Sequence, residues 1–346
     1  GNQIGPTRVN GASEAPNSAT IADQNLNPMH QDELILGYQT ELSDDWSAGV
    51  RGIFRKVQDG MDDYCSYQGF IDWANDNGYE NFDYHTLAGC MFVNPGKDLT
   101  FALDLENDGN FVTTTIPNSY FELPQYSRDY KAVELFWEKA ASDGLYIQGS
   151  YTWSKTEGNA EGYVNSSLEQ ADPGLTQDFD HARFMEGADG PSPNDRRHTF
   201  KMFGNYRINE ELSISASVLI QSGRPVNCNG YVSLEGLSDV DAGNLEGYGP
   251  SAFSCLDENG VSQIAPKGAE GRTPWLYNVD VGFGYQPKWA EGLTLRADIS
   301  NILNLNKVTQ YEEQGDFTRT ERNPDFGVPV AWQSPRQVRL TARYSF

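Results

Sequence analysis

The sequence lacks long apolar runs and is poor in basic side chains. No run of about 18 apolar residues occurs in its 346 residues, so no transmembrane helix can be placed on it. Only 25 basic side chains stand against 49 acidic ones, and a formal charge of -24 would repel the phosphates of a nucleic acid. These shortages exclude a membrane protein built of helices and argue that no nucleic acid is a partner.

Cysteine is also scarce, and its placement is informative. The four cysteines form two local pairs, Cys65 with Cys90 and Cys228 with Cys255, each in a segment rich in Gly, Asn and Asp. This placement favours two loop disulfides and an oxidising compartment. A zinc site is the alternative, but CxxC spacing is absent and His85 is a lone candidate ligand.

Glycine and aromatic residues are plentiful, and period-two alternation is the strongest pattern. Residues 143–157, 212–221 and 293–300 each carry apolar side chains on one face and polar ones on the other. The apolar faces comprise Leu145, Ile147, Gly149, Tyr151 and Trp153; Leu212, Ile214, Ala216, Val218 and Ile220; and Leu293, Leu295, Ala297 and Ile299. Such strands separate two different solvents.

The connections between strands alternate in length. Further strands are predicted at about 33–42, 46–57, 128–141, 195–208, 274–286 and 335–346, nine in all. Short turns alternate with loops of roughly 30 to 70 residues, far beyond ordinary hairpins. Short periplasmic turns and long extracellular loops are typical of outer-membrane β-barrels. Single-chain bacterial barrels have an even number of strands, so nine strands predict only part of a barrel. Residues 1–30 are then predicted to be the end of an extracellular loop.

Tryptophans support the same orientation. Trp46 and Trp137 lie near short-turn ends, whereas Trp153 and Trp275 lie near long-loop ends, as two membrane girdles would require. Tryptophans in a β-sandwich core are the alternative. The polar faces also carry charges, namely Arg296, Asp298, Arg339 and Arg343. A dry sandwich core would bury these charges unpaired, so they favour a wide aqueous interior.

The last strand ends on an aromatic residue. Residues 338–346 alternate strictly, with Tyr344 and Phe346 on the apolar face. This ending resembles the C-terminal signature of outer-membrane proteins, which the barrel assembly machinery reads.

Several segments resemble TonB-dependent outer-membrane receptors of the Oar-like subgroup. Residues 293–304 are similar to the penultimate-strand pattern of these receptors, in which an Asn-rich turn follows the strand. Further similar segments are residues 32–37, 149–154, 194–198 and 221–225. The resemblance implies an all-β fold, the C-terminal portion of an antiparallel transmembrane barrel of about 22 strands. The N-terminal plug, the Ton box and the first strands are absent from these residues.

The resemblance also implies a function. The barrel would lie in outer-membrane lipid with long loops extracellular and its C-terminus periplasmic, and would not be an enzyme. It would take up or translocate an unidentified substrate, energised by the TonB complex through the missing N-terminal part. A passive porin or a surface adhesin barrel is the alternative. A secreted glycan-binding β-sandwich is a further one, although sandwiches have short strands and frequent turns.

Two groups of loop residues are candidate sites. Asp104, Glu106 and Asp108 precede a Gly as in a calcium loop, but residues 112–116 supply no further carboxylate, so a solvated acidic turn competes. No other cofactor is expected. His181 and His198 could form a metal or acid/base cluster; the alternative is a hydrogen-bond cluster at a strand start, with Arg196 or Arg197 paired to loop carboxylates.

Aromatic residues are dense between the first two cysteines. They are Tyr64, Tyr67, Phe70, Trp73, Tyr79, Phe82 and Tyr84. They could bind a peptide or glycan at the cell surface, or form the small core of a stapled loop.

Overall fold

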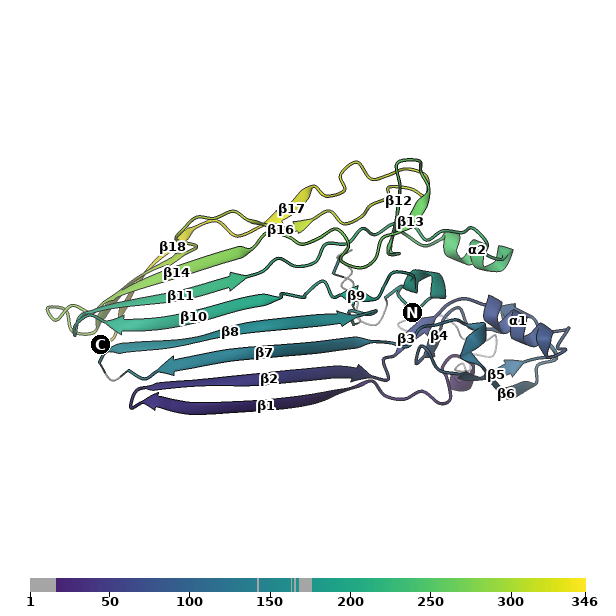
Figure 1. The fold of residues 1–346 in the computed structure, drawn as a ribbon, viewed down its shortest axis with the longest axis horizontal. Coiled ribbons are helices and arrows are strands. Elements are labelled where there is room, and N and C mark those ends of the chain that lie inside the picture. Colours follow the sequence, from purple (N-terminus) through teal and green to yellow (C-terminus); the bar gives the residue numbers. More distant parts are fainter. Residues whose placement is uncertain (1–16, 142, 163, 165, 168–175) are drawn as a thin grey trace.

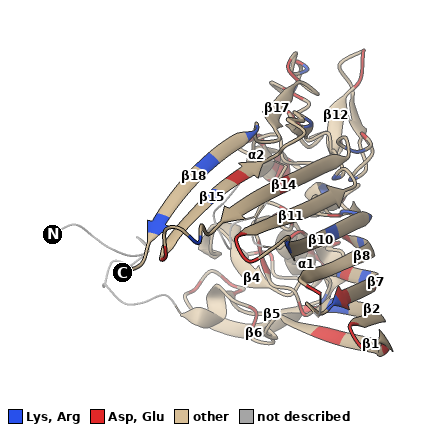
Figure 2. Cartoon of the chain, turned by 90° about the vertical axis from the view of Figure 1, so that its left-hand side faces the viewer, with Lys and Arg blue, Asp and Glu red and all other residues tan. Residues whose placement is uncertain are grey.

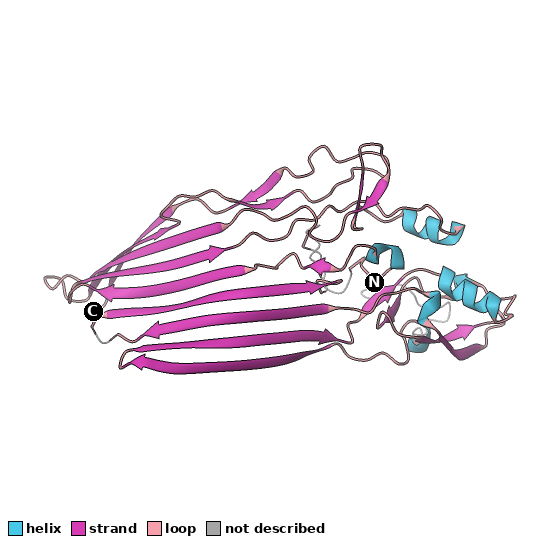
Figure 3. Cartoon of the chain, viewed as in Figure 1, coloured by secondary structure: helices cyan, strands magenta, loops and turns pink. Residues whose placement is uncertain are grey.

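One curved antiparallel sheet dominates the computed structural model (Figures 1 and 3). The structure describes residues 17–141, 143–162, 164, 166–167 and 176–346. The long strands are β1 (His30–Ser43), β2 (Trp46–Gln58), β7 (Arg128–Lys139), β8 (Leu145–Gly158), β10 (His198–Arg207), β11 (Leu212–Gln221), β14 (Leu276–Tyr285), β15 (Leu293–Ser300) and β18 (Gln337–Tyr344). Each strand pairs with the next in this order, and β9 (Gly190–Pro191) pairs with β8. The strands follow an arc rather than a flat plane (Figure 2).

Smaller elements fill the long connections, and they gather at one end of the sheet (Figure 1). The strands are β3 (Asp62–Tyr64), β4 (Met91–Val93), β5 (Leu99–Asp104), β6 (Phe111–Ile116), β12 (Ser254–Leu256), β13 (Ser262–Ile264), β16 (Val308–Tyr311) and β17 (Pro329–Trp332). The helices are α1 (Gln68–Asp76) and α2 (Asp239–Glu246), with 3-10 turns η1 (Ser18–Thr20), η2 (Tyr84–Thr86), η3 (Asn118–Tyr120) and η4 (Ala182–Met185). None of the described helices is long and apolar enough to cross a membrane.

The hydrophobic core lies in these connections and not against the sheet. We call the described residues of 17–29, 59–127, 159–197, 222–275 and 301–336 the loop cap. Its main cluster includes Phe70, Met91, Leu99 and Phe101, and a smaller one surrounds Leu245. In the described long strands, only Ile53 and Ala132 are buried apolar residues, while Leu36 and Leu340 are 64% and 77% exposed. A conventional core therefore holds the cap together in water, and the sheet has none.

All nine predicted strands are present near their predicted positions. Two of the differences at strand ends have a clear cause. The strand predicted at 195–208 begins only at His198, because the Asp195 carboxylate accepts the backbone N–H of Thr156 and holds two arginine side chains. The strand predicted to reach residue 141 ends at Lys139, whose ammonium pairs with Asp143 at 2.9 Å across the turn.

Candidate functional site

The register gives the sheet two chemically different faces. Pairing aligns Leu135 with Tyr151, Met202 with Val218, and Val281 with Ile299, and all of these lie on one face. The other face aligns Glu134 with Thr152 and Arg51 with Glu134. We call these the apolar face and the polar face. The hollows lined by Thr152 and Lys201, and by Arg339 and Thr341, open on the polar face.

The apolar face carries an aromatic group at each end. Ala48 pairs with Trp137 beside Trp46 at the short-turn end. At the loop end, Trp153 pairs opposite His198, whose ring stacks on Trp275 at 5.7 Å. The four predicted tryptophans thus lie near the two ends of the long strands. That they form two membrane girdles stays a prediction. Sequence reasoning missed Trp289, which lies in a short turn and is 78% exposed.

The predicted charges of the polar face lie together. Asp298 pairs with Arg296 at 3.2 Å and with Arg339 at 3.3 Å, and the register aligns Arg343 with Thr294 beside them. All three arginines remain exposed. The polar face can therefore meet water, whereas no described element covers it as the second sheet of a sandwich would.

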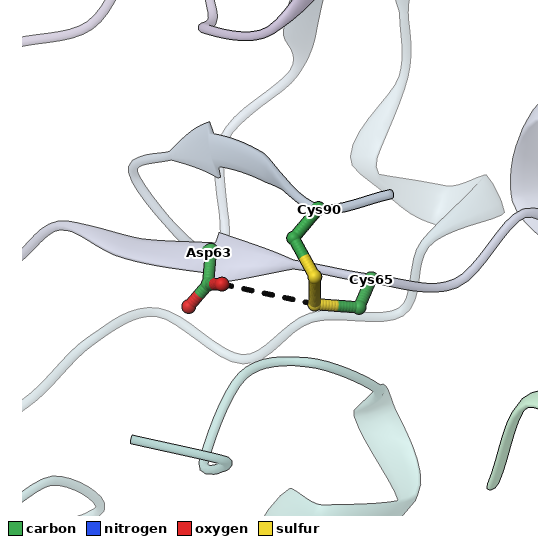
Figure 4. A group of neighbouring side chains, drawn as sticks. All are labelled: Asp63, Cys65 and Cys90. Carbon is green, nitrogen blue, oxygen red and sulfur yellow. Dashed lines mark hydrogen bonds between the residues drawn. A yellow bond between two sulfur atoms is a disulfide. The ribbon is translucent and has the colours of Figure 1, made fainter. Parts of the chain in front are cut away.

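Both predicted disulfides are confirmed. Cys65 is bonded to Cys90, and Cys228 to Cys255. Asp63 Oδ2 lies 3.7 Å from Cys65 Sγ (Figure 4). This group would resemble a metal site only if its cysteines were thiolates; both sulfurs are oxidised, so they offer no such ligand.

The dense aromatic residues form a core. Phe70 is fully buried against Phe121 at 4.9 Å, and Tyr64 packs edge-on to the same ring. Trp73, Tyr79 and Phe82 are partly buried against this cluster. Tyr67 and Tyr84 lie 5.4 Å apart and stay half-buried. The core interpretation is confirmed for the five that join the cluster.

A group of buried carboxylates joins two long loops, and sequence reasoning missed it. Burial raises the pKa of Asp180 to about 7, with the nearby Asp63 charge adding to the effect. Burial likewise raises the pKa of Asp178 to about 6 and holds the pKa of Asp62 well above its usual range. Asp180 Oδ2 accepts the Tyr248 hydroxyl at 2.7 Å, and Asp62 accepts that of Thr176 at 2.8 Å. Burial therefore favours the neutral form of these three carboxyls relative to the same groups in water.

The two histidines have separate partners. His181 Nε2 lies 3.2 Å from Asp241, and His198 Nδ1 lies 2.7 Å from the Tyr151 hydroxyl on the apolar face. They form no joint cluster. Arg197 pairs with Asp195 at 2.8 Å, so the hydrogen-bond cluster at the strand start is present.

The predicted calcium residues lie at the turn between β5 and β6. Asp104 accepts the backbone N–H groups of Asp108 and Gly109 at 3.0 and 2.9 Å, while Asp108 accepts Asn110. Glu106 accepts the Asn81 amide at 3.1 Å. The carboxylates stabilise the turn itself, and calcium binding by Asp104, Glu106 and Asp108 stays a prediction.

These features define the wall of an outer-membrane barrel, and the comparisons agree. The outer membrane β-barrel domain family matches residues 3–339, so the chain belongs to this family. The chain is 28% identical over 307 residues to the TonB-dependent transporter Oar of Myxococcus xanthus, covering 76% of this chain and 27% of that protein. It therefore spans about a quarter of that relative's length.

Two solved structures are similar to this chain at low sequence identity. The outer membrane transporter YddB from Escherichia coli is 12% identical, with a TM-score of 0.48, over 93% of this chain and 33% of its own. The ferripyoverdine receptor of the outer membrane of Pseudomonas aeruginosa is 9% identical, with a TM-score of 0.46, over 93% and 28%.

Proposed function

We propose that this chain forms part of the wall of a TonB-dependent receptor in a bacterial outer membrane. One observation carries the proposal: among the residues that the structure describes, the apolar face has no Asp, Glu, Lys or Arg between its two aromatic groups. On β8 this band runs from Leu145 to Trp153, and Lys155 follows it. Its length is about 26 Å along the strand, or about 20 Å across a membrane at a tilt of about 40°. An outer-membrane barrel needs a band of similar height.

The polar face would then line a path for an unidentified substrate that is taken up or translocated. Similarity to the TonB-dependent transporter Oar supports energy coupling. The contact with the TonB complex is proposed for parts of such a receptor outside residues 1–346. The long loops would be extracellular and the C-terminus periplasmic. Figure 1 supports this orientation, since the C-terminus lies at the end opposite the cap.

The end of the chain is proposed as the signal for the barrel assembly machinery. Tyr344 and Phe346 lie 6.2 Å apart, and both side chains are exposed. An exposed aromatic pair at a free sheet end is available to a partner protein.

The membrane assignment is tested by flotation. Purified protein is mixed with phosphatidylcholine vesicles and centrifuged through a density gradient. We expect it to float with the lipid and to aggregate when detergent is withdrawn without lipid. A protein that stays monodisperse in plain buffer would contradict the assignment.

A second experiment distinguishes a TonB-dependent receptor from a passive porin or adhesin barrel. The intact receptor is cross-linked in cells to TonB, with an unrelated porin from the same membrane as the control. We expect a TonB adduct with the receptor alone. Its absence would favour the passive barrel and leave the membrane assignment standing.

A further inference from the structure

The polar face carries a concentration of positive charge at its loop end. A hollow of about 410 Å³ opens there between the sheet and the cap. Its lining includes four cations, Arg55, Arg128, Arg196 and Lys201, and no carboxylate among the described residues. This is unexpected in a chain whose formal charge is -24.

Three of these cations have no ion pair with a described carboxylate. Arg55 pairs with Glu33 and lies over the Tyr130 ring at 5.2 Å, so its charge is largely compensated. Within the described residues, no carboxylate forms an ion pair with Arg128, Arg196 or Lys201. Of the four cations in the hollow, three are therefore not compensated by any carboxylate that the structure describes.

The loop elements hold Arg196 in a positive environment. Its guanidinium donates to the Ser222 carbonyl at 2.9 Å, which fixes it beside the end of β11. Burial and the nearby Arg224 and Arg272 charges lower the pKa of Arg196. Both neighbours already have carboxylates, Glu313 and Asp195. Since arginine stays protonated, a bound anion would relieve this repulsion.

Arg128 and Lys201 extend the positive surface along the sheet. Arg128 begins β7 and is half-buried, and it also lines an adjoining hollow with Glu161, whose carboxylate accepts the Ser166 N–H at 2.8 Å. Lys201 is exposed in β10, where the register aligns it with Ser150. Hydroxyl groups of Thr152, Ser154, Thr156 and Thr199 line the floor between them. Cations above a hydroxyl floor suit an anion with several oxygens.

We propose that Arg128, Arg196 and Lys201 form an anion-binding site on the polar face, for a group that carries several carboxylate or phosphate oxygens. Each guanidinium group would donate hydrogen bonds to two oxygens of the anion, and the hydroxyl groups would donate to the remaining oxygens. The site goes beyond the proposed function, since it requires neither energy coupling nor a membrane. The anion could be a free solute or an acidic segment of the same receptor.

Calorimetry on the detergent-solubilised chain tests the site. The probes are citrate and inorganic tripolyphosphate, with spermidine as a cationic control. We expect both anions to bind at low salt, and their affinity to fall as the salt concentration rises. Spermidine should not bind to the site. Arg196→Gln and Lys201→Gln should each weaken binding by about tenfold.

Arg343→Gln is the matched control, because Arg343 lies on the polar face of β18 outside the hollow. It should leave the affinity unchanged. Because the Lys201 side chain is exposed, Lys201→Gln should fold normally, and weaker binding by this variant would report on the site itself. If the intact receptor binds neither probe while the chain alone does, the anion is the receptor's own acidic segment; if both bind, it is a solute. The proposal is wrong if the chain alone binds neither anion, or if Arg343→Gln weakens binding as much as Arg196→Gln.

Discussion

Ala216 and Ser217 offer a sharp test of the two-faced wall. They are neighbours in the middle of β11, and both are small and exposed. The register aligns Ala216 with Val281 on the apolar face and Ser217 with Asp280 on the polar face. Replacing each in turn with Arg adds the same volume and charge at the same height.

The two substitutions should differ greatly in their effect on the free energy of unfolding in lipid. An Arg that faces lipid at mid-membrane costs about 2–4 kcal/mol. On the polar face the same side chain meets water and lies opposite Asp280, so Ser217→Arg should change stability by less than about 0.5 kcal/mol. In a protein surrounded by water on both faces, the two changes would cost similar amounts.

The assay is denaturant unfolding in phosphatidylcholine vesicles, followed by tryptophan fluorescence. Ala216→Leu is the control, since it adds volume without charge and should be tolerated on a lipid-facing surface. Equal losses for the two arginine variants, or a larger loss for Ser217→Arg, would refute the assignment of the faces.

Three further predictions concern the loop cap. Replacing Cys228 and Cys255 together with Ser should destabilise the cap by about 3.5 kcal/mol, the chain-entropy value for their separation of 27 residues; amide exchange should rise in β12 and β13 but not in β11. Asp180 has a pKa of about 7 in the fold against an ordinary 3.8. Its contribution to the free energy of unfolding of the cap is therefore fully present below about pH 4 and is lost as the pH rises to about 7, and this loss is at most about 4 kcal/mol. Asp180→Asn should flatten this loss in cap melting curves, and an unchanged slope would exclude Asp180 as its source. If Asp104 binds calcium, millimolar calcium should raise the melting temperature of the cap, and Asp104→Asn should abolish the rise; no rise in the parent protein would remove the site.

The long strands were predictable because their environment is repetitive. Every second residue meets the same solvent, so Leu212 to Ile220 display the pattern without knowledge of their neighbours in space. Strand ends were less predictable because single side chains set them. Asp195 leaves the strand since its carboxylate binds Thr156, Arg197 and Arg272, which are far apart in the sequence.

In the cap, the sequence predicted only contacts between residues that lie near one another along the chain. Cysteine pairing could be read from spacing, and the aromatic cluster from its density. The carboxylate group could not, because Asp62 and Thr176 are 114 positions apart and no periodicity links them. For the hollow a signal existed: Tyr130, Thr156, Thr199 and Lys201 all occupy polar-face positions, although only the register shows which of them lie together.

Different forces hold the wall and the cap, and this difference has a consequence for handling the protein. The wall exposes Leu36, Tyr38 and Leu340 and buries almost no apolar residue, so its burial energy depends on lipid. The cap buries Phe70, Phe101 and Leu245 in its own clusters and carries both disulfides, so it needs water and oxidation rather than lipid. Withdrawal of lipid should therefore disrupt the wall first. Reduction should loosen the cap first, while the strands between the two aromatic groups remain paired.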